Sequence, residues 1–179
     1  MIPRSVVLVC VSIVGAGAAC GDPVHDNEVA ALGPEAPGES PGPTHRAGQP
    51  CLVCHDGSGP GDLKLSVAGT IYIAKGGTDP LPNTRVHLVD ANGSAREAIT
   101  NTVGNFLVPF SEWAPAAPIS VTLSYPADVT PAPNTATMST FIGRDGSCAS
   151  CHYDPAGPSS HGRVYMVLDP GDLQGSANP

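Results

Sequence analysis

Charged and aromatic residues are scarce in this sequence, making up 13% and 4% of its 179 residues. The formal charge of −8 at pH 7 provides no basic surface of the kind that nucleic acid requires, so no nucleic-acid partner is expected. Glycine and proline are abundant instead, at 21 and 20 residues, without a Gly-X-Y repeat. This composition excludes collagen and long coiled coils, and it disfavours a helix bundle.

Long hydrophobic runs are also missing, apart from one at the N-terminus. Residues 1–19 combine an arginine, the apolar run Val6–Val14 and a small-residue end, which is the layout of a secretory signal peptide. The run is short for a membrane-spanning helix, although a permanent anchor is an alternative. Ala18-Ala19-Cys20 resembles a bacterial lipoprotein lipobox, which implies lipidation of Cys20. Gly17 departs from that pattern, so ordinary cleavage that leaves a free Cys20 stays open. We expect an exported protein, in the periplasm or at the cell surface, held to the outer membrane by a lipid anchor.

The rest of the chain divides by composition into a tether, two cysteine-containing segments and a β-rich region between them. Residues 20–43 are acidic and rich in proline and glycine. Such a segment cannot bury enough apolar surface to offset its ordering entropy, so a flexible tether is predicted. The predicted segments are 1–19 (signal), 20–43 (tether), 44–65 (first cysteine segment), 66–141 (β-rich region), 142–162 (second cysteine segment) and 163–179 (final strand and tail).

Short alternating runs separated by turn residues predict antiparallel strands from about Ser66 onward. Turn signals recur roughly every ten residues, which favours a β-sandwich over a parallel sheet. The predicted strands are 67–73, 85–89, 95–100, 106–108, 119–125 and 163–168. The alternation points five side chains toward the core: Val86, Leu88, Phe106, Val121 and Leu123.

Residues 67–125 resemble a carboxypeptidase-regulatory-like domain. The resemblance rests on four stretches: Gly69-Thr-Ile-Tyr, Pro80 to Leu88, Asp90-Ala-Asn-Gly and Thr100 to Phe106. It implies a transthyretin-like sandwich with a spacer or interaction role and no peptidase activity. We therefore expect a mostly β fold, an antiparallel Ig/transthyretin-like β-sandwich flanked by the two loop-rich cysteine segments.

Two pentapeptides with the pattern C-x-x-C-H carry the chemistry: Cys51-Leu-Val-Cys54-His55 and Cys148-Ala-Ser-Cys151-His152. This is the attachment motif of c-type haem, in which two thiols bond to the haem vinyl groups and the next imidazole reaches the iron. A four-thiolate zinc site and disulfides are the alternatives, but neither requires a histidine after each second cysteine. We expect two covalently bound haem c groups, with His55 and His152 as iron ligands.

The second axial ligand of each iron decides what that iron can do. His45 lies six residues before Cys51, and His161 lies nine residues after His152, each in a loop. Both are expected to ligate iron, and the sequence leaves open which haem each histidine caps. Four other residues are weaker candidates, because they lie in the tether, in predicted strands or in a Thr/Ser-rich stretch: His25, His87, Met138 and Met166.

In both motifs the sequence resembles small exported multihaem c-type cytochromes. The resemblance implies single-electron transfer in the cell envelope, with redox proteins as partners. No catalytic residue is expected, because arginine, lysine and histidine do not cluster beyond the ligand candidates. Two other functions stay open: a haem enzyme or gas sensor with one open coordination site, and an adhesion-type lipoprotein with zinc or disulfides at the cysteine pairs. Self-assembly of the chain is also left open.

Overall fold

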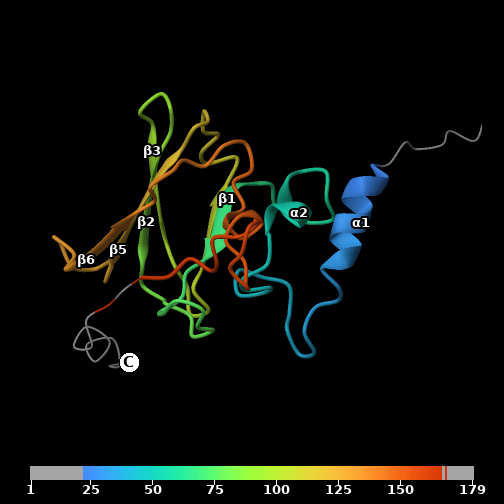
Figure 1. Ribbon diagram of the computed structural model, residues 1–179. Helices are drawn as coiled ribbons and strands as arrows, with labels where there is room; N and C mark the ends of the chain where they lie inside the picture. Colours follow the sequence, from blue (N-terminus) through green and yellow to red (C-terminus); the bar gives the residue numbers. More distant parts are fainter. Residues whose placement is uncertain (1–21, 167, 169–179) are drawn as a thin grey trace, which may run out of the picture.

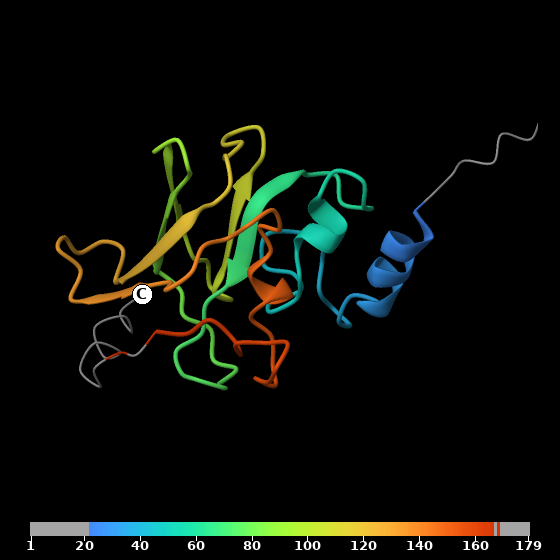
Figure 2. The same ribbon diagram turned by 45° about the horizontal axis from the view of Figure 1, so that its top comes forward.

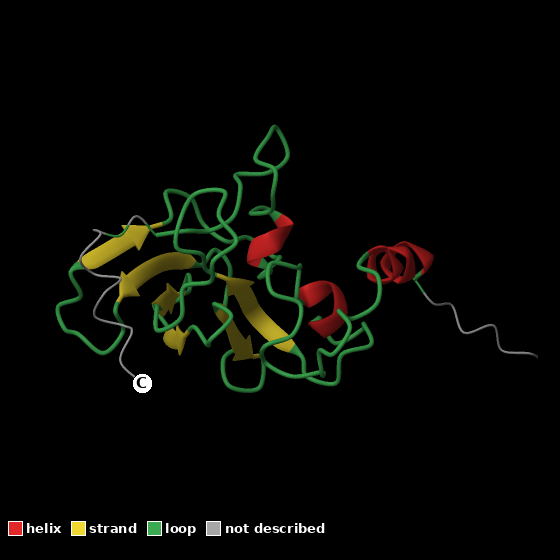
Figure 3. Cartoon of the chain, turned by 90° about the horizontal axis from the view of Figure 1, so that it is seen from below, coloured by secondary structure: helices red, strands yellow, loops and turns green. Residues whose placement is uncertain are grey.

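The computed structural model describes residues 22–166 and residue 168 (Figure 1). The predicted signal peptide, Cys20 and most of the C-terminal tail lie outside the described residues. Within them the protein is mostly β, with two antiparallel sheets, few and short helices, and long loops (Figure 3). None of the helices in this part of the chain has the length and apolar character needed to cross a membrane.

Within residues 22–166, six strands form the two sheets. They are β1 (Leu65–Thr70), β2 (Arg85–Val89), β3 (Ala95–Ile99), β4 (Asn105–Pro109), β5 (Ser120–Tyr125) and β6 (Asn134–Thr137). The larger sheet has the order β3-β2-β5-β6, and the smaller one pairs β1 with β4. β2 coincides with its prediction, and β3, β4 and β5 lie within two residues of theirs. β6 was not predicted, because its short Thr-rich stretch has little apolar alternation.

Buried side chains from both sheets join in one hydrophobic core. Four of the five residues predicted to point inward are buried there: Val86, Leu88, Phe106 and Leu123. Val121 is only partly buried and packs against this core. The alternation along the predicted strands therefore identified the inward face correctly.

Part of the segment predicted as a tether is helical. Helix α1 (Pro23–Ala31) begins at Asp22, whose side chain accepts hydrogen bonds from the N–H groups of Val24 and His25. Pro23 suits the first helical position, because its missing N–H would have no partner there. No residue of α1 is buried, so the N-cap at Asp22 stabilises this helix more than packing does.

The segment predicted as a final strand forms one isolated parallel bridge, between Tyr165 and Tyr72. The N–H of Tyr72 donates to the carbonyl of Val164 (2.9 Å), and that of Met166 donates to the carbonyl of Tyr72 (3.2 Å). Met166 is buried in the core, as expected for a residue that packs in the fold. The C-terminal segment thus lies beside the stretch that follows β1.

Both cysteine segments are placed against β1. The first contains helix α2 (Leu52–His55) and the second contains the short 3-10 helix η1 (Cys148–Ser150), and both contact β1. The backbone N–H of Ala68 in β1 donates to the carbonyl of Gly146, just before η1. Figures 1 and 2 show α1 and α2 on the side of β1 that faces away from the four-stranded sheet.

Candidate paired-histidine sites

The two pentapeptides adopt the same turn. The N–H of His55 donates to the carbonyl of Cys51 (3.0 Å), and the N–H of His152 donates to that of Cys148 (2.8 Å). Side chains at positions i, i+3 and i+4 share one face of a helical turn. The C-x-x-C-H spacing therefore presents both thiols and the imidazole of each motif on one side.

Each motif histidine is held by a backbone carbonyl at Nδ1. The Nδ1 of His55 lies 2.8 Å from the carbonyl oxygen of Leu63, and that of His152 lies 3.0 Å from the carbonyl oxygen of Gly162. A carbonyl can only accept, so Nδ1 must be the donor in both rings. The opposite nitrogen, Nε2, is then left as the ligating atom of each imidazole.

A second imidazole faces each motif histidine. The ring centroids of His45 and His55 are 5.9 Å apart, and those of His152 and His161 are 5.5 Å apart. The two rings are inclined at 44° in both pairs. The sequence left open which motif each loop histidine serves, and the fold brings each to the motif nearest in sequence.

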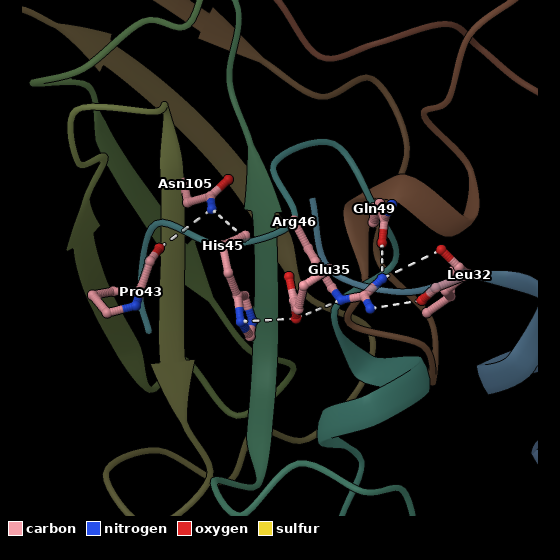
Figure 4. Close-up of polar contacts among 8 residues, drawn as sticks. Leu32, Glu35, Pro43, His45, Arg46, Gln49 and Asn105 are labelled. Atoms are coloured by element: carbon pink, nitrogen blue, oxygen red, sulfur yellow. Dashed lines mark hydrogen bonds and ion pairs between the residues drawn. The ribbon is translucent and has the colours of Figure 1, made fainter. Parts of the chain in front are cut away.

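The loop that carries His45 is tied to β1 and β4. Asn105 of β4 donates from its side-chain amide to the carbonyls of Pro43 (3.3 Å) and His45 (3.0 Å), as Figure 4 shows. The N–H of Gly48 donates to the Thr70 hydroxyl of β1 (2.7 Å). The Asn105 contacts join residues 60 and 62 positions apart, and the Gly48–Thr70 contact joins residues 22 positions apart, which local sequence reasoning does not predict.

The loop that carries His161 is tied directly to its own motif. The backbone N–H of His161 donates to the carbonyl of Cys151 at 2.9 Å. The side chain of Ser160 lies between Cys151 and Tyr153 and hydrogen-bonds to both. His161 itself is exposed, whereas His45 is half-buried. The two pairs therefore differ in how much solvent reaches them.

The four motif thiols are free, and three of the four cysteines are partly buried, whereas Cys151 is exposed. Burial raises the pKa of the Cys51 thiol, and burial together with the nearby Cys51 raises that of Cys148 to about 12. Redox-active dithiols have lowered pKa values, so these two thiols lack that character. The effect of Cys51 on the Cys148 thiol agrees with the contacts of both motifs with β1, which bring the motifs close together.

A cavity of about 380 Å³ opens beside the second motif. Its wall includes Cys148, Cys151, His152 and His161, and apolar side chains of both sheets complete it. Phe141, whose side chain is largely exposed, and Met138 also line this cavity from the loop after β6. Sequence reasoning gave Met138 only as a weak ligand candidate and did not single out Phe141.

The remaining weaker candidates take no part in either histidine pair. His87 projects from β2 toward Glu97, with 3.3 Å between its Nδ1 and the carboxylate, and stays off the core as expected. His25 lies on α1, and its Nε2 is enclosed without a hydrogen-bond partner. The described residues form no group of three or more His, Cys, Asp or Glu side chains that could hold a metal ion.

The chain matches no family model, and no curated protein or solved structure is significantly similar to it. The resemblances to a carboxypeptidase-regulatory-like domain and to multihaem cytochromes therefore stay predictions. Any functional proposal must rest on the arrangement of the residues described above.

Proposed function

We propose that this protein is an exported dihaem c-type cytochrome that carries single electrons and transforms no substrate. The observation that carries the proposal is the pairing of each C-x-x-C-H histidine with a second imidazole, at 5.9 and 5.5 Å between ring centroids. Haem c, when attached to such a motif, supplies an iron that changes its charge by one electron.

The spacing of the paired rings suits two imidazoles on opposite sides of one metal ion. A metal–imidazole bond is about 2.0–2.1 Å long, and the ring centroid lies about 1 Å beyond the nitrogen, so such rings stand about 6 Å apart. Haem would need only two further ligands from the protein, because its porphyrin supplies four nitrogens. A pair of histidines is therefore a complete donor set for haem.

The surroundings of the second motif also suit a flat apolar group. The cavity of about 380 Å³ beside Cys148 and His152 has a largely apolar wall, and Phe141 and Met138 border it. Apolar walls would favour binding of the haem macrocycle, because binding removes its apolar surface from water. The thiols that would form the thioether bonds belong to the same wall.

Two protein ligands for each iron favour an electron carrier over an enzyme or gas sensor. His45 and His161 would fill the positions that oxygen, peroxide or nitrite need. The contact of both motifs with β1 supports electron exchange between the two haems within one chain. The expected partners are redox proteins that donate electrons to this pair of haems and accept electrons from it.

The finer features of the fold and the location belong to the same proposal. The single core shared by the two sheets supports a transthyretin-like sandwich as the scaffold of both haems. Export, and lipidation at Cys20 that anchors the protein to the outer membrane, rest on the N-terminal sequence alone. A Cys20→Ser variant is expected to move from the membrane fraction to the soluble fraction.

The experiment that tests the proposal is co-expression with a cytochrome c maturation system, followed by intact mass and a pyridine haemochrome spectrum. Two haems per chain that resist acid acetone are expected. The EPR spectrum should show low-spin ferric iron, and the ferrous protein should bind CO poorly. A chain at the apo mass would contradict the haem proposal. A high-spin signal with stoichiometric CO binding would favour the enzyme or sensor.

A further inference from the structure

Two polar atoms without hydrogen-bond partners lie on neighbouring side chains behind the first histidine pair. They are Nδ1 of His45 and Oε2 of Glu35, both enclosed by the protein. The other carboxylate oxygen of Glu35 lies 3.6 Å from the same Nδ1 (Figure 4). A small rotation of the ring would let His45 donate from Nδ1 to this carboxylate, which would leave its Nε2 free toward His55.

Arg46 fixes the position of Glu35. Its Nε lies 2.8 Å from Oε1 of Glu35. The rest of the guanidinium donates to the carbonyls of Leu32 (3.3 Å) and Gly33 (2.8 Å) and to the side chain of Gln49 (2.8 Å). An arginine with this many acceptors is held in one orientation. The carboxylate is therefore preorganised beside His45 and is not free to swing into solvent.

We propose that Glu35 is a positioning residue for His45 and that it makes the first haem the harder of the two to reduce. The inference rests on the proposed function, since it concerns His45 as an iron ligand. A carboxylate that accepts the far N–H of a ligating imidazole fixes the ring and raises its basicity. A more basic ligand stabilises the ferric state.

The second histidine pair has no equivalent carboxylate. Nδ1 of His152 faces the backbone carbonyl of Gly162, and within residues 22–166 no carboxylate forms an ion pair or hydrogen bond with His161. The two haems are therefore electrostatically unequal. The first electron that enters the protein is expected to rest on the second haem, beside His161.

A Glu35→Gln variant tests the charge while keeping the size of the side chain. The lower of the two midpoint potentials should rise, with about a tenfold change in the reduction equilibrium, which is about 59 mV for one electron. The higher midpoint should stay in place. A Glu35→Asp variant keeps the charge and should stay close to the parent protein. If the lower of the two midpoint potentials rose as much in Glu35→Asp as in Glu35→Gln, the proposal would be contradicted.

The chain offers a matched control in Glu97. Glu97 lies on β3 and also contacts an arginine and a histidine, both on the neighbouring β2. Its carboxylate is 2.7 Å from the guanidinium of Arg85 and 3.3 Å from Nδ1 of His87. Glu97→Gln removes the same charge and should leave both midpoints unchanged. An equal shift in the two Gln variants, or no shift in Glu35→Gln with both haems bound, would overturn the inference.

The readouts separate this inference from the function on which it rests. Haem content and the low-spin EPR signal of the parent protein test the cytochrome proposal alone. The midpoint shift in the Glu35 variants tests the positioning role alone, and it is measured only on protein with two haems. A His161→Ala variant exposed to CO identifies the second haem, because only the midpoint that responds to CO belongs to it.

Discussion

At the scale of single residues, the candidate sites depend on residues outside the two motifs, such as Glu35 and Gly61. Glu35 meets His45 through the arrangement of loops, and its place beside the ring follows from the contacts of Arg46. Gly61 lies against His55, so that a Cβ there would come within 2.4 Å of Nδ1. Gly61 leaves room for the imidazole of His55, and we propose that Glu35 positions the imidazole of His45.

The exposed His161 gives a sharp test of two-histidine ligation. Replacing His161 with alanine removes one imidazole from the pair with His152 while leaving both thiols of that motif intact. We expect two haems per chain, a partial high-spin signal and binding of about one CO per chain. The control is His87→Ala, which should bind no CO. Unchanged low-spin spectra in His161→Ala would show that another group caps the second iron.

Gly61→Ala should disturb the first motif. The added Cβ would meet Nδ1 of His55 at 2.4 Å and the carbonyl oxygen of Cys54 at 2.8 Å, closer than Cβ contacts normally come. The imidazole must then leave the carbonyl of Leu63, so we expect reduced haem content measured by the haemochrome spectrum. Gly157→Ala is the matched control, because a Cβ there meets nothing within 4 Å and the residue does not line the cavity beside the second motif. Equal haem content in both variants would contradict this role of Gly61.

At the scale of elements, β1 is the strand that joins the core to the candidate sites. Its outer contacts hold α2 and η1, while its pairing with β4 brings Phe106 into the shared core. Gly69 of β1 lies so close to Cys148 that a Cβ would stand 2.6 Å from the thiol. The stability of the β core and the placement of the motifs are therefore linked through this strand.

Phe106→Ala should destabilise the protein strongly. Phe106 of β4 is 3% exposed and belongs to the core, so its truncation should lower the free energy of unfolding by about 3–5 kcal/mol. Ile99→Ala on β3 is the control, since this side chain is 57% exposed and its truncation should cost less than about 1 kcal/mol. Urea denaturation measures both, and similar costs would mean that the inward face has been misassigned.

The turn between β2 and β3 should make stability depend on pH. Asp90 accepts hydrogen bonds from the N–H groups of Ala116, Ser94 and Asn92, which lower the pKa of its carboxyl group. A lowered folded-state pKa stabilises the fold above the unfolded-state value of about 3.9, and this stabilisation is lost as pH falls through the folded-state pKa. The unfolding free energies of the parent and Asp90→Asn should differ at pH 7 and converge in acid. A difference that is constant with pH would contradict this role.

At the scale of the whole molecule, the fold places both motifs against one strand, β1, of a small β protein. Cys51 and Cys148 are 97 positions apart in sequence, yet Cys51 contributes to the raised pKa of the Cys148 thiol. Two haems attached there would be neighbours within one chain. This proximity is what a single-chain electron relay requires.

Neighbouring haems should interact magnetically. The fully oxidised protein is expected to show EPR signals broadened by spin–spin interaction between the two ferric ions. A variant with both cysteines of the first motif replaced by serine should bind one haem and give a sharper signal. If the two-haem spectrum equals the sum of the two single-haem spectra, the haems are further apart than the contacts with β1 imply.

The sequence by itself determined the local features of this protein. The alternation of β2 and of β5 identified their inward residues, and the C-x-x-C-H spacing dictated which side chains share a turn, because both depend on neighbours within a few residues. The tertiary structure decided how these parts meet. The loop that brings His45 to His55 and Glu35 is held by Asn105 and Thr70 of the two strands β4 and β1. The cavity lined by Phe141 likewise gathers residues of both sheets, so both features arise from contacts between distant segments. Such contacts depend on how loops close over the core, and no short-range pattern in the chain records that.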